Sequence, residues 1–311
     1  MSANLPPSAP IVLDAGNREH ELVAALVLIQ AKIEPMEKLA ASMEAFGSAV
    51  KYLNYRKGGE LLPLFTPKIF GEVLATVTNW RARNVDVRMT FDRDYPSNLR
   101  SIYNKPPLIF VKGVWREGVD SWGVAVVGTR KPSDDGLRRA AHLARKLAEA
   151  KVTVISGLAR GIDGAAHAAA LAGGGRTIAV MGTGLDRVYP REHAGLARDI
   201  VAAGGALMTQ FFPDQPPTPW TFPMRNVVMS GLSVATVVVE ASKTSGARKQ
   251  ARNALEHGRT VLLLRSLVEE HEWAREMAEV GEFGARGTVV ESADDVIQRV
   301  VAPAPNERLA V

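Results

Sequence analysis

From Gly123 onward the chain alternates between short apolar runs and longer helical runs, and this alternation limits the choice of fold more than any other feature. The apolar runs are rich in Val, Ile and Leu and read as buried strands, whereas the longer runs carry apolar residues at helical spacing. Strands that alternate with helices of this length are typical of a parallel α/β sheet. The predicted strands cover residues 124–127, 152–155, 178–181, 206–209, 234–240, 261–264 and 288–290, and the predicted helices cover residues 136–150, 164–172, 192–203, 244–257, 269–280 and 293–301.

The N-terminal part of the chain has a different pattern. Apolar residues recur at helical spacing within residues 22–33, 36–46 and 69–80, and Pro35 and the Gly58-Gly59 pair interrupt them. We therefore predict a small helical region over residues 1–84, a sheet domain over residues 85–302 and a tail over residues 303–311. Residues 85–89 are expected to form a short strand.

Composition narrows the class of protein. The chain has 311 residues, a formal net charge of +5 and no cysteine, which excludes disulfides, thiolate nucleophiles and cysteine-ligated zinc. The N-terminus has no basic segment followed by an apolar core, and no apolar run approaches the ~20 residues that a membrane helix needs. We expect a cytoplasmic protein with no membrane association, and the mild positive charge is compatible with a polyanionic partner.

One strand-to-helix turn has the features of an anion site. Residues 156–163 follow a predicted strand, and Gly157 and Gly161 allow the backbone to approach a ligand closely. Asp163 stands where a helix N-cap is expected, and Arg160 adds a positive charge. A helix N-terminus behind a glycine turn is suited to binding an anion, but a capped tight turn with a surface arginine is an equally good interpretation.

Similar turns follow other predicted strands. Gly128-Thr129 follows the first strand of the alternating part, and Gly182-Thr183-Gly184 follows the third. Because the carboxyl ends of parallel strands meet at one edge of a sheet, we expect these turns to share a phosphate-binding crevice. Ser245-Gly246 begins another helix, and Lys243 and Arg248 flank it. This basic stretch can bind phosphate or form a solvated helical face.

The motifs in this order resemble those of the DNA-processing protein A family. The matching segments are Gly128-Thr129-Arg130, residues 156–163 with His167, residues 182–186 with Tyr189-Pro190, residues 222–226, and residues 230–233. The resemblance implies an extended Rossmann-like sheet with helices on both faces that binds single-stranded DNA and mediates DNA processing and recombination. We expect a diverged member of the family that lacks the C-terminal winged helix that some relatives carry.

The resemblance assigns roles to individual residues. Arg130 and Arg225 are expected to contact DNA phosphates, although a surface ion pair and a helix-start ion pair would also explain them. Phe222 is expected to stack on a base or to belong to the core. The residues expected to bind nucleic acid are Arg130, Arg160, Phe222, Arg225, Asn226, Lys243 and Arg248. The expected phosphate-binding turns contain Gly128, Thr129, Gly157, Gly161, Gly182, Thr183, Gly184, Ser245 and Gly246.

The sequence contains no recognisable catalytic set. We find no nucleophile elbow, P-loop, metal-ligand cluster or Gly-x-Gly-x-x-Gly motif, so we expect no catalytic residues, no metal and no cofactor. His167 is interpreted as structural. Glu240 and Asp186, near strand ends, can bind a ribose, cap a helix or pair with an arginine. A nucleotide phosphoribohydrolase stays an alternative, although the Pro-Gly-Gly-x-Gly-Thr-x-x-Glu motif usual in that class is absent.

Several positions depart from the family pattern. Val227 replaces an expected arginine, Thr209-Gln210 replaces a Ser-Glu pair, and residues 245–251 and 264–270 also differ. These changes favour a role in a defence or mobile-element locus and keep open a third function, as a nucleotide-binding regulator or antitoxin. The expected partners are single-stranded DNA, a second copy of the chain in a homodimer, and a recombinase or toxin protein.

Overall fold

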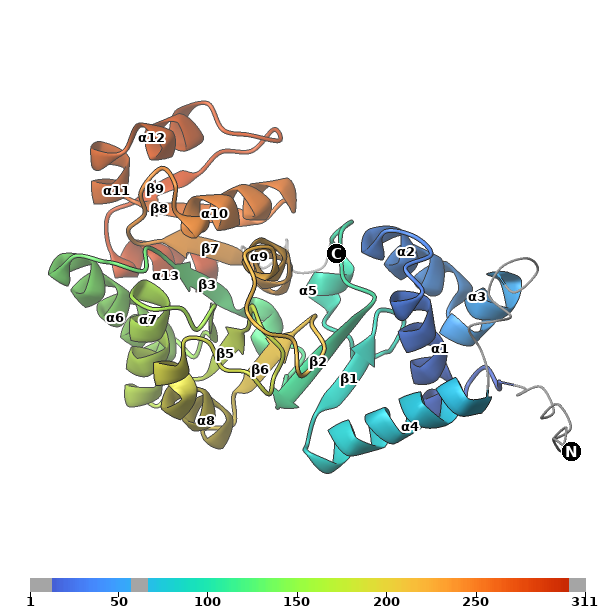
Figure 1. Ribbon diagram of the computed structural model, residues 1–311. Helices are drawn as coiled ribbons and strands as arrows, with labels where there is room; N and C mark the ends of the chain where they lie inside the picture. Colours follow the sequence, from blue (N-terminus) through green and yellow to red (C-terminus); the bar gives the residue numbers. More distant parts are fainter. Residues whose placement is uncertain (1–12, 57–66, 302–311) are drawn as a thin grey trace, which may run out of the picture. The chain divides into compact units, whose positions relative to one another are not determined.

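The computed structural model describes residues 13–56 and 67–301, so the expected tail at residues 303–311 lies outside the described part. The chain divides into two compact units: residues 1–95 with 106–108, and residues 96–105 with 109–311. The first unit contains the helices α1 (Arg18–Gln30), α2 (Met36–Phe46), α3 (Ala49–Arg56) and α4 (Pro67–Ala82) and the strand β1 (Asp86–Met89) (Figure 1). The expected helical N-terminal region is therefore confirmed.

Helix α1 is the buried element of the first unit. The side chain of Asn17 caps it by accepting hydrogen bonds from the backbone N–H groups of Glu19 and His20. The carboxylate of Glu21 is buried in α1 and accepts hydrogen bonds from Ser48 Oγ (2.5 Å) and the Val50 N–H (3.0 Å). Because these donors lie at the start of α3, the buried carboxylate connects α3 to α1. It also accepts from the Val50 N–H, which has no partner within α3 because it lies in the first turn.

A mostly parallel sheet forms the second unit. Its strands lie in the order β2-β6-β5-β4-β3-β7-β8-β9. All neighbours pair in parallel except β2, which runs antiparallel to β6. The strands are β2 (Leu108–Gly113), β3 (Val124–Val127), β4 (Val154–Ser156), β5 (Thr177–Val180), β6 (Ala206–Thr209), β7 (Ala235–Val238), β8 (Thr260–Leu264) and β9 (Thr288–Val290). The expected parallel α/β architecture is thus confirmed.

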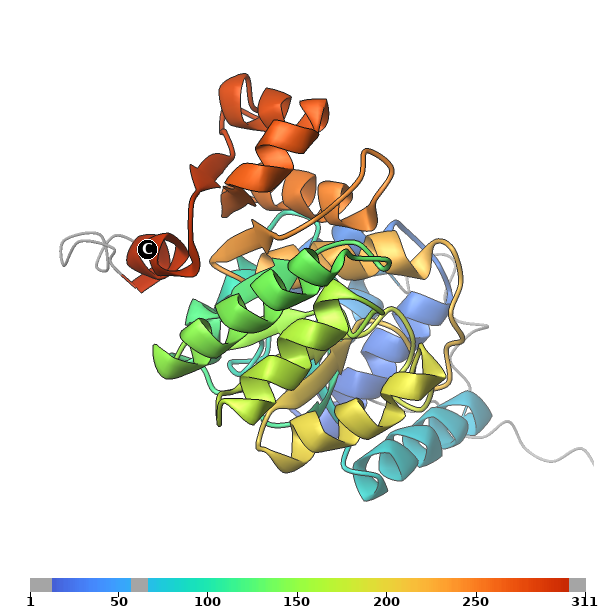
Figure 2. The same cartoon turned by 90° about the vertical axis from the view of Figure 1, so that its left-hand side faces the viewer.

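Helices cover both faces of this sheet. The connections from β3 through β6 advance in one direction, and those from β7 through β9 advance in the other. Since such crossovers are right-handed, the two sets of helices lie on opposite faces; α6, α7 and α8 form one row (Figure 2). The helices of this unit are α5 (Ser97–Arg100), α6 (Asp134–Glu149), α7 (Ile162–Ala172), α8 (Ala194–Ala202), α9 (Thr221–Leu232), α10 (Gly246–Glu256), α11 (Arg265–Glu270), α12 (Glu272–Glu279) and α13 (Ala293–Val301), with short 3₁₀ turns η2 (Asp120–Trp122) and η3 (Arg191–His193).

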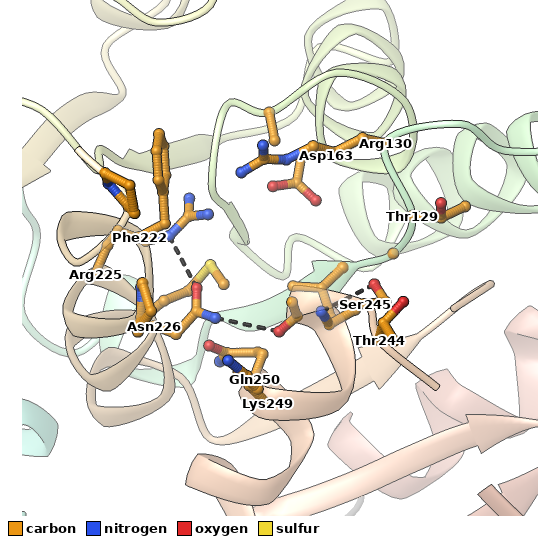
Figure 3. Close-up of a pocket in the computed structure, with 18 of the residues that line it drawn as sticks. Thr129, Arg130, Asp163, Phe222, Arg225, Asn226, Thr244, Ser245, Lys249 and Gln250 are labelled. Atoms are coloured by element: carbon orange, nitrogen blue, oxygen red, sulfur yellow. Dashed lines mark hydrogen bonds between the residues drawn. The ribbon is translucent and has the colours of Figure 1, made fainter. Parts of the chain in front are cut away.

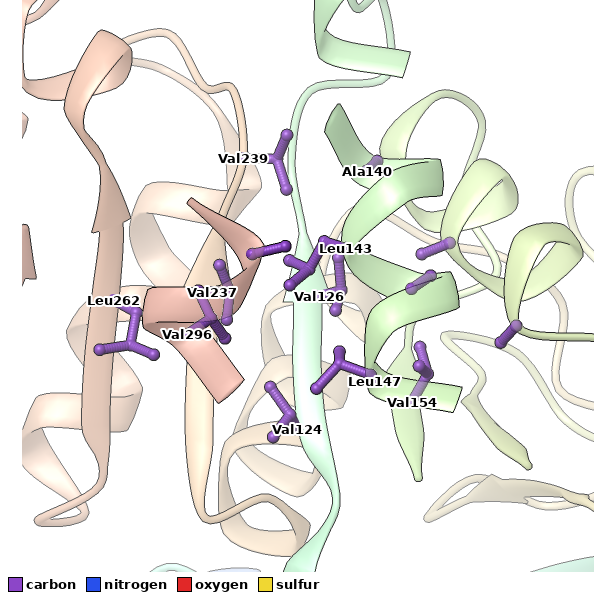
Figure 4. Close-up of a cluster of buried hydrophobic side chains, with 14 of the residues drawn as sticks. Val124, Val126, Ala140, Leu143, Leu147, Val154, Val237, Val239, Leu262 and Val296 are labelled. Carbon is purple, nitrogen blue, oxygen red and sulfur yellow. The ribbon is translucent and has the colours of Figure 1, made fainter. Parts of the chain in front are cut away.

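A hydrophobic core lies between the centre of the sheet and α6, α7 and α13. Val126 and Val237 point from adjacent strands toward Leu143 of α6 and Val296 of α13, and all four side chains are almost completely buried (Figure 4). Helix α7 contributes mainly alanines to this layer, which lets it pack closely against α6. The core fixes β3 and β7 side by side, and this pair determines where the site lies.

A polar cluster closes the amino edge of the same sheet. Asp120 precedes β3 and is completely buried. Its carboxylate pairs with Arg176, which precedes β5, at 2.5 Å, and accepts hydrogen bonds from Thr153 Oγ1 (2.8 Å) and the Arg116 N–H (2.6 Å). Arg176 also donates to the carbonyl oxygens of Val114 and Gly204. One carboxylate therefore connects the starts of three strands and the loop after β2.

Two helical segments differ from the sequence-based expectation. Helix α9 was not predicted, because its apolar residues surround much of its circumference and Pro223 and Gly231 interrupt the pattern. Such a helix is buried on several sides, and periodicity does not reveal it. The single helix expected over residues 269–280 is instead two helices, α11 and α12, separated at His271, which adopts an extended backbone conformation.

Candidate nucleic-acid interface

The principal pocket lies at the carboxyl edge of the sheet between β3 and β7. The connections that leave these two neighbouring strands run in opposite directions, so their loops separate and leave a crevice. The pocket has a volume of about 740 Å³ (Figure 3). It is lined by residues 127–131 at the end of β3, by the start of α9, and, after β7, by Ser242, residues 244–247, Lys249 and Gln250. The order of the strands in the sheet therefore determines where the pocket lies. The predicted strands did not by themselves reveal this order.

Arg130 and Phe222 form one wall of this pocket. Arg130 is exposed in the turn after β3, and its guanidinium carbon lies 4.9 Å from the centroid of the Phe222 ring. The Tyr189 ring approaches Phe222 from another side, with 5.7 Å between the centroids. Within the described ranges, Arg130 forms no ion pair with a carboxylate. The expected juxtaposition of Arg130 and Phe222 is present, with Phe222 half-buried at the pocket rather than in the core.

Two glycines make room for the side chains of α9. A Cβ atom on Gly182 would lie 2.6 Å from the Phe222 ring, and one on Gly157 would lie 1.6 Å from Arg225 Nη1. Real Cβ atoms do not approach other atoms this closely. The glycine turns after β4 and β5 therefore permit α9 to pack onto the carboxyl ends of these strands. The sequence analysis expected these turns to bind phosphate and did not predict this structural role.

Arg225 is buried beneath the pocket. Its Nη1 donates to the Val180 carbonyl oxygen (2.9 Å) and its Nε donates to Asn226 Oδ1 (3.0 Å). Burial lowers the pKa of Arg225, while the nearby charge of Asp163 opposes that shift. Asn226 Nδ2 donates in turn to the Gly246 carbonyl oxygen (3.2 Å). Arg225 and Asn226 thus join α9 to β5 and to the start of α10, and both line the pocket.

Asp163 occupies a different position from the one expected. Gly161, not Asp163, is the N-cap of α7, and its φ of +77° requires glycine. Asp163 lies in the first turn of the helix, almost completely buried, and its Oδ2 accepts a hydrogen bond from the Gly157 N–H (3.1 Å). Burial raises the pKa of Asp163, and the Arg225 charge opposes that increase. The carboxylate therefore closes the 157–163 turn from within.

The remaining expected residues are spread over a wider surface. Arg160 is exposed and forms a bidentate ion pair with Glu192 instead of lining the pocket. Arg248 faces Trp273, 5.9 Å from its ring centroid, and donates to the Lys243 carbonyl oxygen (3.4 Å). Thr183 is buried and donates to the Arg187 carbonyl oxygen. The structure does not bring Lys243, Arg248 or the 182–184 turn into the pocket lining.

The start of α10 supplies pocket residues that the sequence analysis did not select. Ser245 caps α10 by accepting from the Ala247 N–H (3.2 Å), and Ser245 and Gly246 line the pocket as expected. Lys249 and Gln250 lie one turn further along the helix and line it too. The Gln250 amide is buried and, in its best orientation, donates to the Asn226 carbonyl oxygen (2.9 Å). Lys249 belongs to the same basic stretch as Lys243 and Arg248, for which phosphate binding was considered from the sequence.

Glu240 positions the turn that carries Arg130. Its carboxylate accepts hydrogen bonds from Ser133 Oγ (2.7 Å) and the Ser133 N–H (3.0 Å), and its carbonyl oxygen accepts from the Thr129 N–H (2.7 Å). Glu240 therefore holds Ser133, which is the residue that caps α6. His167 is completely buried with Nδ1 2.7 Å from Thr177 Oγ1, and burial lowers its pKa to about 3. This environment agrees with a structural role.

Replacing Gly157 with alanine should destabilise the protein. The new methyl group would occupy the position of the buried Arg225 guanidinium, and moving that group breaks its hydrogen bond to Val180. Overpacking of this kind costs about 1–3 kcal/mol. Gly246→Ala is the matched control, because nothing lies within 4 Å of its Cβ position. Thermal melts of both variants test this, and equal melting temperatures would contradict it.

Two kinds of feature are absent from residues 13–56 and 67–301. None of their helices is long and apolar enough to cross a membrane. They also contain no cluster of three or more His, Asp or Glu side chains arranged to hold a metal ion.

The chain is similar to several known proteins. Protein Smf of Escherichia coli strain K12 is 46% identical over 170 residues, which is 55% of this chain and 45% of that protein. DNA processing protein DprA of Bacillus subtilis strain 168 is 38% identical over 197 residues, which is 63% of this chain and 65% of that protein. Each alignment thus spans less than two thirds of the relative's length.

Solved structures show the same fold. DNA processing protein A of Streptococcus pneumoniae superimposes with a TM-score of 0.65 and 28% identity, covering 88% of this chain and 95% of that one. DNA processing protein A of Helicobacter pylori has a TM-score of 0.59 and 23% identity, covering 70% and 95%. The family model of DNA recombination-mediator protein A matches residues 86–301. Because this match covers most of the chain, the chain belongs to the DNA recombination-mediator protein A family.

Proposed function

We propose that this protein is a non-catalytic DNA-processing and recombination mediator that binds single-stranded DNA in the pocket between β3 and β7. The observation that carries the proposal is the exposed guanidinium of Arg130, which has no carboxylate partner among the described residues and lies over the Phe222 ring. A free cation beside a partly exposed aromatic ring matches a nucleotide, which presents a phosphate next to a flat base.

The proposed binding mode assigns two functions to the pocket. Arg130 and Lys131 at one side hold a phosphate, and Lys249 adds charge from α10. Phe222 offers its ring to an unstacked base. Because a duplex keeps its bases stacked inside, this mode favours a single strand over a duplex. Phosphate contacts and stacking are common to all nucleotides, so we expect little dependence on base sequence.

Family membership supports this proposal. The solved structure of the Helicobacter pylori relative is described by its single-stranded DNA binding mode, and we propose the same class of ligand for this chain. The departures at Val227 and in residues 245–251 are the grounds on which we extend the proposal to a defence or mobile-element setting.

The hydrolase alternative has less support. Glu240 is the carboxylate that a hydrolase would be expected to use. Its two oxygens, however, accept three hydrogen bonds from Ser133. Asp163 is almost completely buried and turned toward the Gly157 N–H. Both carboxylates are thus engaged in holding turns of the backbone, which favours a structural role for each.

A titration of a labelled single strand and of the matching duplex, read by fluorescence anisotropy at several salt concentrations, tests the function. The single strand should bind more tightly, and the logarithm of its affinity should fall linearly with the logarithm of salt by roughly 0.7 for each phosphate neutralised. An affinity for single strands that does not change with salt would overturn the proposed binding mode. Equal affinity for the duplex would overturn the role of an unstacked base.

A further inference from the structure

An exposed tryptophan stands beside the pocket at the start of α9. Trp220 precedes the first residue of α9 and is 51% exposed, which is unusual for so large an apolar side chain. Its ring packs edge-on against Phe211, with 5.7 Å between centroids and an interplanar angle of 79°. This contact covers only part of the side chain, since half of the Trp220 surface stays open to solvent.

The fold places Trp220 and Phe222 next to each other along the carboxyl edge. Phe222 packs on Gly182, directly after β5, and Trp220 packs on Phe211, just after β6. Since β5 and β6 are parallel neighbours, the two supports lie side by side at the same edge. The edge therefore presents Arg130 beyond β3, then Phe222 above β5, then Trp220 above β6.

The segment before Trp220 is held rigidly. Pro216, Pro217 and Pro219 restrict its backbone. The Gly184 N–H donates to the Gln215 carbonyl oxygen (3.0 Å), and the Thr221 hydroxyl donates to the Thr218 carbonyl oxygen (2.9 Å). An aromatic side chain displayed by a fixed loop loses little conformational freedom when a ligand stacks on it.

We propose that Trp220 is a second stacking platform, which holds the base of a nucleotide neighbouring the one bound between Arg130 and Phe222. The inference rests on the proposed function, because it extends the same DNA path along the sheet edge. A planar nucleobase is the ligand that suits an exposed indole adjoining a phosphate-binding pocket, since stacking requires no particular base. The track runs from β3 toward β6, away from β7.

Replacing Trp220 with alanine should weaken single-strand binding by roughly five- to a hundredfold, as expected for loss of one stacked base. The salt dependence should not change, because stacking displaces no counterion. Trp220→Phe should keep most of the affinity, whereas Trp220→Leu should not, because leucine is apolar but has no π face. Quenching of tryptophan fluorescence by single-stranded DNA should fall strongly in Trp220→Phe.

Trp122→Ala is the matched control. Trp122 has a similar exposure of 44%, but it precedes β3 and so lies at the amino edge of the sheet. The Trp122→Ala variant should bind DNA as the unaltered protein does. An equal loss in Trp122→Ala and Trp220→Ala, or equal binding by the leucine and phenylalanine variants, would overturn the inference. If Trp220→Ala binds normally while Phe222→Ala binds weakly, Trp220 is not a stacking platform. The proposed function would still hold in that case.

Discussion

Replacing Arg130 with alanine is expected to lower the affinity for single-stranded DNA by roughly tenfold to a hundredfold, the usual range for one hydrogen bond to a charged group. The slope of log affinity against log salt should shrink by roughly 0.7, because one phosphate is no longer neutralised. The melting temperature should hardly change, since the described contact of the Arg130 guanidinium is with the Phe222 ring. Anisotropy titrations across salt, with thermal melts, measure all three quantities.

Two further variants sharpen this test. Arg130→Lys keeps the charge, so it should retain the salt slope while losing the part of the affinity that depends on the planar guanidinium. Arg299→Ala removes an arginine near the end of α13, where Arg299 pairs with Asp295 at 2.8 Å. Because α13 follows β9 and runs back toward the amino edge, this variant should bind normally. If Arg130→Ala binds like the unaltered protein, the DNA does not enter this pocket.

Replacing Asp120 with alanine is expected to lower the free energy of unfolding by about 3–5 kcal/mol, the range found when one partner of a buried ion pair is removed. The reason is the environment of Arg176, whose side chain is only 13% exposed and would lose its sole carboxylate partner in the described structure. The Thr153 hydroxyl and the Arg116 N–H would lose their acceptor as well. Urea unfolding, compared by linear extrapolation, measures the change.

An exposed ion pair provides the control for this prediction. Asp135 and Arg138 form an i,i+3 pair on α6 with side chains 61% and 70% exposed, so Asp135→Ala should change stability very little. DNA affinity of the folded Asp120→Ala protein should equal that of the unaltered protein, since this cluster lies at the opposite edge of the sheet from Arg130. A stability loss no larger than that of Asp135→Ala would show that the cluster contributes little.

Local patterns in the sequence were sufficient for the elements and for part of the site. The β-branched runs after Gly123 correctly predicted every strand from β3 to β9, because strand formation in a buried parallel sheet depends on the composition of each run. The glycine turns at Gly128, Gly157 and Gly182 follow three of these strands, so their common edge followed from parallel pairing. Arg130 and Phe222 were selected through the resemblance to a family, and the structure brings the two together.

Helix α9 marks the limit of these local patterns. It is buried on several sides, so its residues show no amphipathic period, and the sequence did not reveal that Phe222, Arg225 and Asn226 share one helix. The sequence also did not reveal the structural role of Gly157 and Gly182. Both were expected to bind phosphate, yet each leaves space for a side chain from a helix more than 35 residues away in the chain. Close approach between distant segments leaves no trace in either segment alone.

The sequence by itself determined that this chain builds a parallel α/β sheet with glycine turns and arginines at one edge, because strand formation, turn geometry and charge are properties of neighbouring residues. The tertiary structure alone decided that β3 lies beside β7, which opens the pocket. It also decided that Arg160 pairs with Glu192, whereas Arg130 pairs with no carboxylate among residues 13–56 and 67–301. These outcomes depend on which distant surfaces pack together, and that is set by the burial of the whole core rather than by any one segment.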